Sequence, residues 1–326
     1  MISNSTFKLL AISKLPKIGK SAINQLAKKP INWSDSFESI IEKNLPNYHP
    51  DSITNEILNW ANNIKKIADQ AGDYIISQLD DAYPSQLIDT FDAPAFLFCR
   101  GNISLLATKC IAVIGTRTPS NDGKIIGNNI TKWFTDNSWT IVSGLALGID
   151  TIAHKSCIEN SGKTIVVLGT NLNKIYPPEN ENLLNKILLN DGLVISEYAY
   201  DNKGFRSQFV ERDRIQAGLS NAVILIQSDL AGGSMHASKA ILKYKRFLII
   251  ANQSRTGILN NHPKIEANLT LINSDIEKIK KVFEINELDE TQIIKMMNRY
   301  EYETVNKKIL NLNRIQFKNT NASFDF

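Results

Sequence analysis

Residue types that build disulfide frameworks and metal centres are scarce in this sequence. Its 326 residues include three cysteines, Cys99, Cys110 and Cys157, of which no two form a CxxC pair, and four histidines, none of them in an HExxH motif. Disulfide scaffolds and zinc knuckles need paired cysteines, and a reducing compartment is the default for a chain without them. We therefore expect a cytoplasmic protein with no metal and no cofactor.

Long apolar runs are also missing. No stretch reaches the roughly 18 consecutive apolar residues of a membrane span. The first residues, MISNSTFKLL, lack the charged region and long apolar run of a signal peptide. Hydrophobic residues make up 43% of the chain, as in a globular protein, and the net charge of +4 is compatible with a nucleic-acid partner. The expectation is a soluble protein that has no membrane partner.

The motifs of several common enzyme classes are absent as well. No GxxxxGK[ST] occurs, which excludes a P-loop NTPase, and no GxSxG elbow accompanies a catalytic triad. The first apolar strand-like run ends in Gly-Thr-Arg instead of GxGxxG, which disfavours a dehydrogenase. Asp150 and His154 lie one helical turn apart, but two residues without a third ligand do not make a metal site.

What the sequence does contain is a regular alternation of strands and helices. Short β-branched runs alternate with helical stretches from Cys110 onward, which indicates βαβ units and a parallel sheet covered by helices on both faces. The predicted fold class is α/β, an extended Rossmann-like, doubly wound, mainly parallel sheet with an N-terminal helical module and a helical C-terminal tail. The predicted divisions are a helical module over 1–85, the Rossmann-like domain over 86–275 and a helical, partly frayed extension over 276–326.

A turn near Gly19 interrupts the helical pattern of the first segment. The break LPKIGK leads from one amphipathic stretch into another. One interpretation is a helix–hairpin–helix, whose backbone N–H groups hold a phosphate. The other is an ordinary helical hairpin in which Gly19 serves the turn.

Small residues stand where the predicted strands stop. The strand ends read GTRTPS, SGLALGID, GTNLNKIYP, SEYAYDNKG and QSDLAGGS. Ligands of doubly wound sheets bind beyond the carboxyl ends of the strands, where glycine permits close backbone approach and helix N-termini favour an anion. Five such loops along one edge predict a phosphate-bearing ligand.

Individual residues of these loops receive specific hypotheses. Arg117 follows a strand end and is expected to contact phosphate directly. Of Arg212 and Arg214, which do not share a helix face, one is expected to point into the pocket and the other to pair with an acid such as Glu211 or Asp213. Tyr176 either stacks on a base or shapes its loop.

Two residues of the SGLALGIDTIAHK segment are assigned structural roles. Asp150 suits the N-cap of the helix that begins there, a position worth about 1 kcal/mol. His154 lies one turn further along. It is either a hydrogen-bonded core residue or a ligand contact.

Five ordered blocks resemble one protein family. IAVIGTR, SGLALGIDTIAHK, VVLGTNLNKIYPPENENLL, GLVISE and ERDRIQAGLSNAVILIQ…GGSMHASKA have the order and spacing of the DNA-processing protein A (DprA/Smf) family. The segment from Tyr83 to Asn102 is similar to the one that leads into that family's Rossmann domain. The likeness covers roughly residues 80–250.

The resemblance implies a binding protein, not an enzyme. It implies single-stranded DNA as ligand, a homodimer, and a role in loading the recombinase RecA during transformation. The expected nucleic-acid or phosphate contacts are Gly115, Thr116, Arg117, Ser143, Gly144, Gly148, Gly169, Tyr176, Ser196, Arg212, Arg214, Gly232, Gly233, Ser234 and Lys239.

The chain departs from the family pattern in several places. The family's Arg-Asn-Arg is Arg212-Asp213-Arg214 here, which adds a negative charge beside the expected phosphate site, and its Pro-Gly after the last strand is replaced by NQSRTGILNN. A divergent branch, in transformation or in phage defence, is consistent with these differences. The alternatives are a nucleotide sensor and a phosphoribohydrolase of the lysine-decarboxylase-like (LOG) group. The latter is disfavoured because Lys239 stands where that group places a glutamate, and a cation repels an oxocarbenium charge.

Overall fold

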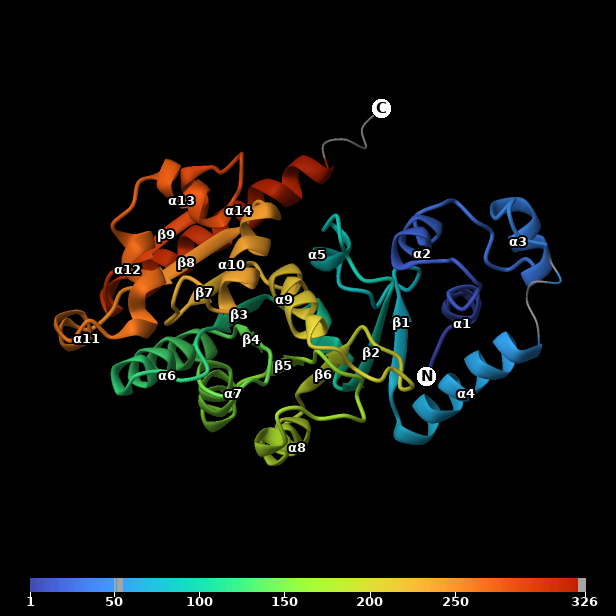
Figure 1. Cartoon of the computed structure of the whole chain (residues 1–326), viewed down its shortest axis with the longest axis horizontal. Helices are drawn as coiled ribbons and strands as arrows, with labels where there is room; N and C mark the ends of the chain where they lie inside the picture. The colour runs from blue at the N-terminus through green and yellow to red at the C-terminus, as the bar shows by residue number, and fades with distance from the viewer. Residues whose placement is uncertain (50, 52–54, 322–326) are drawn as a thin grey trace.

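A nine-stranded sheet forms the centre of the molecule in the computed structural model, which describes residues 1–49, 51 and 55–321 (Figure 1). The strand order is β1-β2-β6-β5-β4-β3-β7-β8-β9. In this order, every pair of neighbouring strands from β6 to β9 is parallel. The pairs β1 with β2 and β2 with β6 are antiparallel. The predicted α/β fold with a mainly parallel sheet is confirmed.

All six strands that the sequence pattern predicts are present. Their side chains are buried throughout, because helices cover both faces of a parallel sheet. The bounds are β3 Cys110–Ile114, β4 Thr140–Ser143, β5 Thr164–Val167, β6 Leu193–Ser196, β7 Ala222–Leu225 and β8 Phe247–Ala251.

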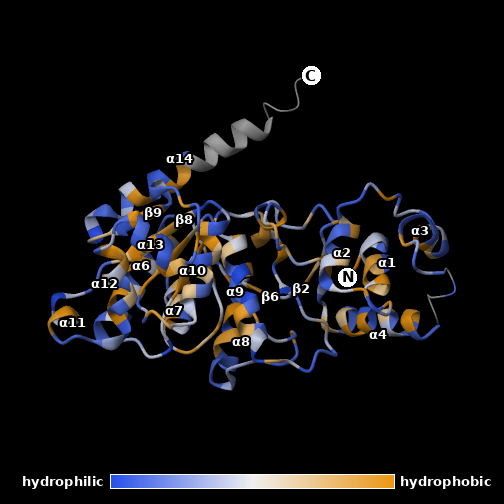
Figure 2. Ribbon diagram, turned by 45° about the horizontal axis from the view of Figure 1, so that its top comes forward, coloured by the Kyte–Doolittle hydropathy of each residue, from blue (hydrophilic) through white to orange (hydrophobic). Residues whose placement is uncertain are grey.

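Helices cover the two faces with separate hydrophobic clusters. One face packs against α5 Ser85–Ile88, α9 Ser207–Leu219, α10 Ser234–Lys243, α12 Glu266–Ile272 and α13 Ile276–Phe283. The other packs against α6 Asn121–Asp136, α7 Ile149–Glu159, α8 Glu181–Leu189 and α14 Tyr302–Asn321. Figure 2 shows hydrophobic residues concentrated on the strands and on the helix sides that meet them.

Shorter elements complete the chain. A five-residue helix, α11 Arg255–Leu259, follows β8. The 3-10 helices are η2 Ile103–Ala107, η3 Pro178–Asn180, η4 Pro263–Ile265, η5 Glu290–Gln292 and η6 Arg299–Glu301.

Three strands lie where the sequence pattern predicts helix or assigns nothing. β1 Tyr74–Ser77 falls within the predicted helical module and pairs with β2 Phe96–Gly101. β9 Ile293–Met296 falls within the predicted helical extension and adds to β8. The helical segments expected over 1–85 and 276–326 thus each contain one strand as well. Each strand has at most six residues, and its hydrogen bonds come from a distant neighbour, so local periodicity does not reveal it. The domain boundaries themselves stay a prediction.

The first four helices form a module at one end of the sheet (Figure 1). They are α1 Asn4–Ile12, α2 Lys20–Ala27, α3 Phe37–Asn44 and α4 Asn55–Ala71. A separate hydrophobic cluster holds the first three together. Gly19 is the N-cap of α2 with an ordinary φ of −97°, so the turn does not require glycine there.

The strand order creates one switch point in the sheet. From β3 the chain adds β4, β5 and β6 on one side, then returns to place β7 and β8 on the other side of β3. Consecutive crossovers on opposite sides leave a crevice beyond the carboxyl ends of β3 and β7, which is where ligands bind in such sheets.

Candidate phosphate-binding site

A cavity of about 370 Å³ lies at this switch point. It is lined by the loop after β3, the loop that leads from β4 into α7, α9, the loop between β7 and α10, and Lys264 of η4. Of the residues predicted from the sequence as ligand contacts, those on its wall are Gly115, Thr116, Arg117, Arg212, Gly232, Gly233 and Ser234. A smaller hollow, which also touches Arg117 and Arg212, adds Gly144 and Tyr176.

The loop after β4 is held in shape by Asp150. Its Oδ2 accepts backbone N–H bonds from Gly144 at 3.1 Å and Ala146 at 3.2 Å, on either side of Leu145, which has a left-handed φ of 63°. The N-cap of α7 is Gly148, so the predicted N-cap role for Asp150 is wrong. Asp150 is the second residue of the helix. It stabilises the preceding loop instead of the helix end.

Two glycines of this loop permit close approach. A Cβ at Gly144 would overlap the guanidinium of Arg212. Gly148 has a φ of +80°, and a Cβ there would overlap the carbonyl groups of Thr116 and Arg117 in the neighbouring loop. These glycines bring an arginine side chain and two strand-end loops together at the cavity.

Arg212 supplies a buried cation at the cavity. The residue is 5% exposed, its Nη1 donates to the carbonyl oxygen of Val167 at 2.5 Å, and its Nε lies 3.1 Å from Asp213 Oδ1 without hydrogen-bond alignment. The ion pair with Asp213 and the bond to Val167 hold the guanidinium in place on the cavity wall.

Arg117 supplies a second, exposed cation. In the part of the chain that the structure describes, no hydrogen bond or ion pair joins its guanidinium to another residue. The side chain extends from the loop after β3 to the wall of both hollows. Its guanidinium is free to take an anion from solvent.

The structure separates Arg212 from Arg214. Arg214 Nη2 lies 2.6 Å from Glu197 Oε2, and the residue faces a different cavity. Arg212 is thus the arginine at the strand ends, and the acid partner of Arg214 is Glu197, not Glu211 or Asp213. Two residues apart on α9, they point to different sides of the helix.

Asp213 sets the charge balance of the cavity. Arg117, Arg212 and Lys264 face three carboxylates, Asp150, Asp213 and Asp229. Burial raises the pKa of Asp213 to about 7, and the nearby Arg212 and Arg117 offset this only in part. Burial also raises the pKa of Asp150. An anion is therefore bound more readily when Asp213 is protonated.

His154 is a core residue. It has no exposed surface, and its Nδ1 lies 2.8 Å from Thr164 Oγ1. Burial and the charge of Arg212 lower its pKa to about 3, so the imidazole is neutral. Of the two interpretations, the structure supports the core residue.

Several other predicted contacts do not reach the cavity. Ser143 Oγ donates to the carbonyl oxygen of Val113 in β3 at 2.8 Å, and Ser196 Oγ donates to that of Thr170 in the loop after β5 at 2.6 Å. Gly169 packs beneath Phe209. Lys239 Nζ lies 2.8 Å from Glu284, so its assignment as a phosphate contact, and the argument against a hydrolase built on it, are wrong. The helical repeat places Lys239 about 140° round α10 from Ser234.

The sequence pattern missed other cavity residues. They include Phe209, Gln216, Asp229 and Lys264. Asp229 belongs to the QSDLAGGS strand end, so the argument from strand ends could have identified it. Phe209, whose ring centre lies 5.2 Å from that of Tyr176, has no distinguishing motif. Lys264 pairs with Asp229 at 2.5 Å from a segment far along the chain.

The remaining expectations concern absent features. Among residues 1–49, 51 and 55–321, no three potential metal ligands gather at one point. No described helix is long and apolar enough to cross a bilayer. Cys99, Cys110 and Cys157 are buried free thiols.

Fold and cavity together define a Rossmann-like protein with a cavity at the switch point of its sheet. A model of the DNA recombination-mediator protein A family matches residues 74–287. The chain belongs to this family, and the resemblance seen in its sequence motifs is confirmed.

Relatives of known name match about half of the chain. The DNA processing protein DprA of Streptococcus pneumoniae is 42% identical over 159 residues, 49% of this chain and 56% of the relative. Protein Smf of Escherichia coli is 34% identical over 178 residues, 55% of this chain and 48% of the relative. The chain spans about half the length of the curated relatives it matches.

Two solved structures are similar throughout the fold. An X-ray structure of DNA processing protein A from Streptococcus pneumoniae has a TM-score of 0.58 at 27% identity, covering 84% of this chain and 99% of that one. A structure of the Helicobacter pylori protein, described for its single-stranded DNA binding mode, has a TM-score of 0.53 at 27% identity, covering 72% and 93%.

Proposed function

We propose that this chain binds single-stranded DNA by holding its phosphates in the strand-end cavity. The observation that carries the proposal is the pair of arginines on the cavity wall, the buried Arg212 and the exposed Arg117, of which Arg117 has no ion-pair partner among the residues that the structure describes. Arg117 adds an unpaired cation at the rim, and the glycines of the surrounding loops allow a backbone phosphate to approach.

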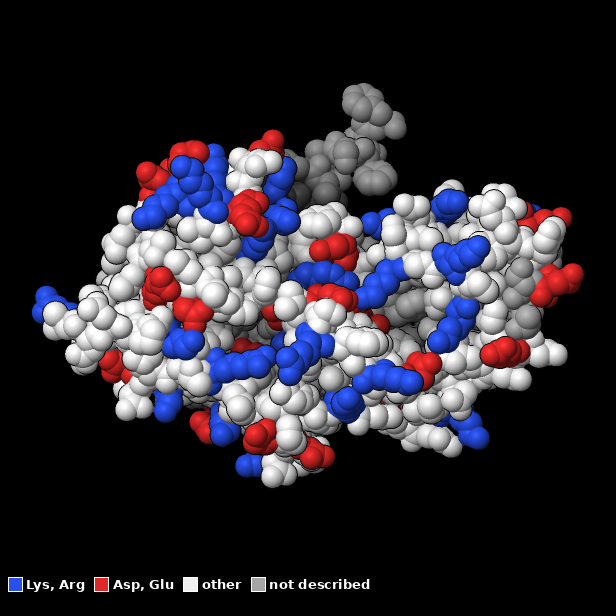
Figure 3. All heavy atoms as spheres, viewed as in Figure 1, with Lys and Arg blue, Asp and Glu red and all other residues white. Residues whose placement is uncertain are grey.

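The surroundings favour a single strand. Tyr176 is 47% exposed beside the cavity and provides a stacking surface for an unpaired base. A band of Lys and Arg side chains also crosses the face seen in Figure 3, from the sheet domain toward the N-terminal helices. The Helicobacter pylori relative is described as a single-stranded DNA binder.

Anisotropy of a labelled oligonucleotide tests the proposal. Single strands should bind more tightly than duplex of the same length. Affinity should fall steeply with salt, since each neutralised phosphate of a single strand contributes about −0.7 to the log–log slope. Equal affinity for duplex, or affinity independent of salt, would refute the proposal.

Catalytic turnover is not part of the proposed role. Each carboxylate in the cavity is engaged: Asp150 by loop N–H groups, Asp229 by Lys264, and Asp213 by Gln216 Nε2 at 2.9 Å. No cavity carboxylate is left free to stabilise a cationic sugar.

Two partners follow from the family. We propose that the chain forms a homodimer and delivers bound strands to a RecA-type recombinase. Analytical ultracentrifugation tests the first, and recombinase filament assembly on coated strands tests the second. A strict monomer, or unchanged assembly, would contradict the respective proposal.

A further inference from the structure

A second and larger cavity lies between the N-terminal helices and the sheet. Its volume is about 820 Å³, within the range of small-molecule sites, which often lie between domains. The end of α1, α2, α4, β2, the loop after β6, and α9 all contribute to its wall. None of the residues on this wall belongs to the strand-end cavity.

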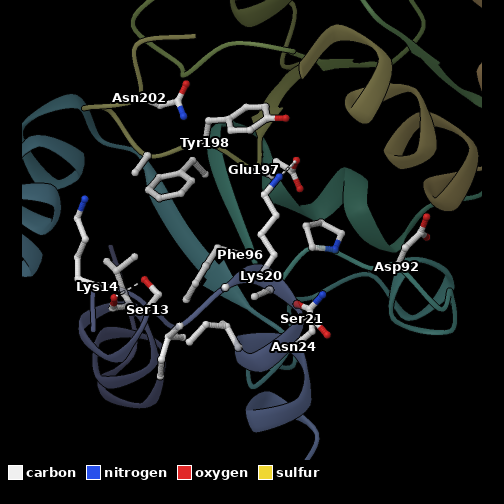
Figure 4. Close-up of a pocket in the computed structure, with 18 of the residues that line it drawn as sticks. Ser13, Lys14, Lys20, Ser21, Asn24, Asp92, Phe96, Glu197, Tyr198 and Asn202 are labelled. Carbon is white, nitrogen blue, oxygen red and sulfur yellow. Dashed lines mark hydrogen bonds and ion pairs between the residues drawn. The ribbon is translucent and has the colours of Figure 1, made fainter. Parts of the chain in front are cut away.

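An aromatic ring stands in the middle of this cavity. Figure 4 shows Phe96, from β2, between the turn that carries Ser13 and Lys14 and the side chain of Lys20. Two other aromatic side chains are already covered: Lys14 Nζ lies 4.4 Å from the ring centre of Trp60, and Lys20 Nζ lies 5.2 Å from that of Tyr198. Phe96 is partly buried where it packs against two hydrophobic clusters, and Phe91, which is 67% exposed, is a further ring on the wall.

The charged groups around the ring leave one cation unpaired. Lys20 is shared between Glu197 at 3.1 Å and Glu211 at 2.9 Å. Three carboxylates line the cavity, and each has a cation: Asp201 has Lys14 at 3.4 Å, Glu197 has Lys20 at 3.1 Å, and Asp92 has Arg214 at 3.9 Å. Lys28 is the fourth cation on the wall. Among the residues described, its ammonium forms no ion pair or hydrogen bond.

Two further groups on α2 lack partners. No side chain caps the N-terminus of α2, and Gly19, Lys20 and Ser21 at that end line the cavity. Asn24, one turn further along the same helix, has a buried Oδ1 without a hydrogen-bond partner. Aromatic rings, an unpaired ammonium and an uncapped helix N-terminus therefore line one cavity.

From this arrangement we infer that the interdomain cavity binds one unstacked nucleotide, with its base on Phe96 and its phosphate against α2 and Lys28. Base stacking on an aromatic ring and a cation for the phosphate are the two elements of single-strand recognition. The nucleotide is either a unit of a DNA strand or a free mononucleotide. The inference does not depend on the strand-end site.

The experiment uses the full chain, with deoxyadenosine monophosphate in calorimetry and a labelled oligo(dT) in anisotropy. Phe96→Leu keeps an apolar side chain and removes the ring face, and its control is Phe205→Leu at an exposed position outside both cavities. Lys28→Gln is compared with Lys29→Gln, the exposed next residue, which lines neither cavity. Arg117→Ala reports on the strand-end site separately, and thermal melts check folding.

The expected result is a loss of roughly five- to hundredfold in nucleotide affinity for Phe96→Leu and a smaller loss for Lys28→Gln. The two control variants should bind the nucleotide like the parent, and Arg117→Ala should keep the portion of the binding that Phe96→Leu removes. Should only oligo(dT) respond to Phe96→Leu and Lys28→Gln, the strand is the source of the nucleotide, and the inference still holds.

Three results would overturn the inference. One is mononucleotide binding that Arg117→Ala abolishes and Phe96→Leu leaves intact, which assigns the nucleotide to the strand-end cavity. Another is parent-like binding of both probes by folded Phe96→Leu and Lys28→Gln. The third is equal loss in the test variants and their controls. Strand binding that fails only in Arg117→Ala would uphold the proposed function while refuting this second site.

Discussion

Asp213 should make phosphate binding depend on pH near neutrality. Its carboxyl lies in the strand-end cavity beside Arg212, and burial raises its pKa to about 7. Below pH 7 the neutral carboxyl leaves the charges of Arg212 and Arg117 available to phosphate. Above pH 7 the carboxylate competes for the same cations, so DNA affinity should fall as pH rises.

The size of the effect follows from Coulomb's law. A carboxylate and a phosphate about 6 Å apart repel by about 3 kcal/mol at an effective dielectric constant of about 20. Partial solvent access reduces this figure, so we expect Asp213→Asn to bind DNA roughly ten times more tightly at pH 8 and about equally at pH 6. Asparagine keeps the shape and retains an oxygen for Gln216.

The assay is anisotropy of a labelled oligonucleotide between pH 6 and 9 at constant ionic strength. The parent should lose about tenfold in affinity from pH 6 to pH 8, and Asp213→Asn should be nearly flat. The other charged groups facing Asp213 are Asp150, Arg117, Arg212 and the Lys264–Asp229 pair. Parallel pH curves for parent and variant would refute the reasoning, because another group would then carry the titration.

The same carboxyl affects stability with a defined sign. Because the folded pKa lies above the unfolded value of 3.8, the folded chain holds this proton more tightly, and stability falls as pH rises from about 4 to 7. At about 1.4 kcal/mol per pH unit, the cost is at most roughly 4 kcal/mol. Asp213→Asn should therefore unfold at higher urea concentration than the parent at pH 8. An equal or lower midpoint would contradict the assigned shift.

Three further outcomes are expected. Gly144→Ala should displace Arg212, weakening DNA binding at least tenfold and lowering the free energy of unfolding by about 1–3 kcal/mol in urea titrations. The control is Gly233→Ala, where a Cβ meets nothing within 4 Å and stability should not change. Equal effects of the two substitutions would refute this packing argument. Tyr176→Leu should weaken single-strand binding about fivefold or more in anisotropy and leave duplex binding unchanged; unchanged single-strand affinity would mean that Tyr176 only shapes its loop. Incubation with nucleoside monophosphates should release no free base on chromatography, whereas multiple turnovers would favour a hydrolase.

Much of the sheet was predictable because its strands are buried on both faces. Runs such as CIAVI, TIVV and AVIL need no alternating pattern, and each ends at a loop of small residues. Those loops located the switch-point cavity correctly through Gly115, Arg117 and Gly232. Strands β1, β2 and β9 were not predicted, because their pairing depends on distant segments of the chain.

The sequence did not predict in which direction several side chains of the site point. Arg212 and Arg214 share a motif, yet helix geometry sends one to the cavity and the other to Glu197. Lys239 follows the glycine loop in sequence, but its ammonium pairs with Glu284 outside the cavity. Asp150 holds a loop whose shape depends on a left-handed Leu145, which no spacing rule reveals. Contacts made across the fold decided these roles.

The most direct test of the central claim compares two arginines. Arg117 lines the strand-end cavity, whereas Arg255 is equally charged, exposed on α11 and outside both cavities. Arg117→Ala should weaken single-stranded DNA binding by about 1.5–3 kcal/mol and reduce the salt slope by about 0.7, with an unchanged melting temperature. Arg255→Ala should bind like the parent. Normal binding by Arg117→Ala, or equal losses in the two variants, would contradict the assignment of this cavity as the DNA site.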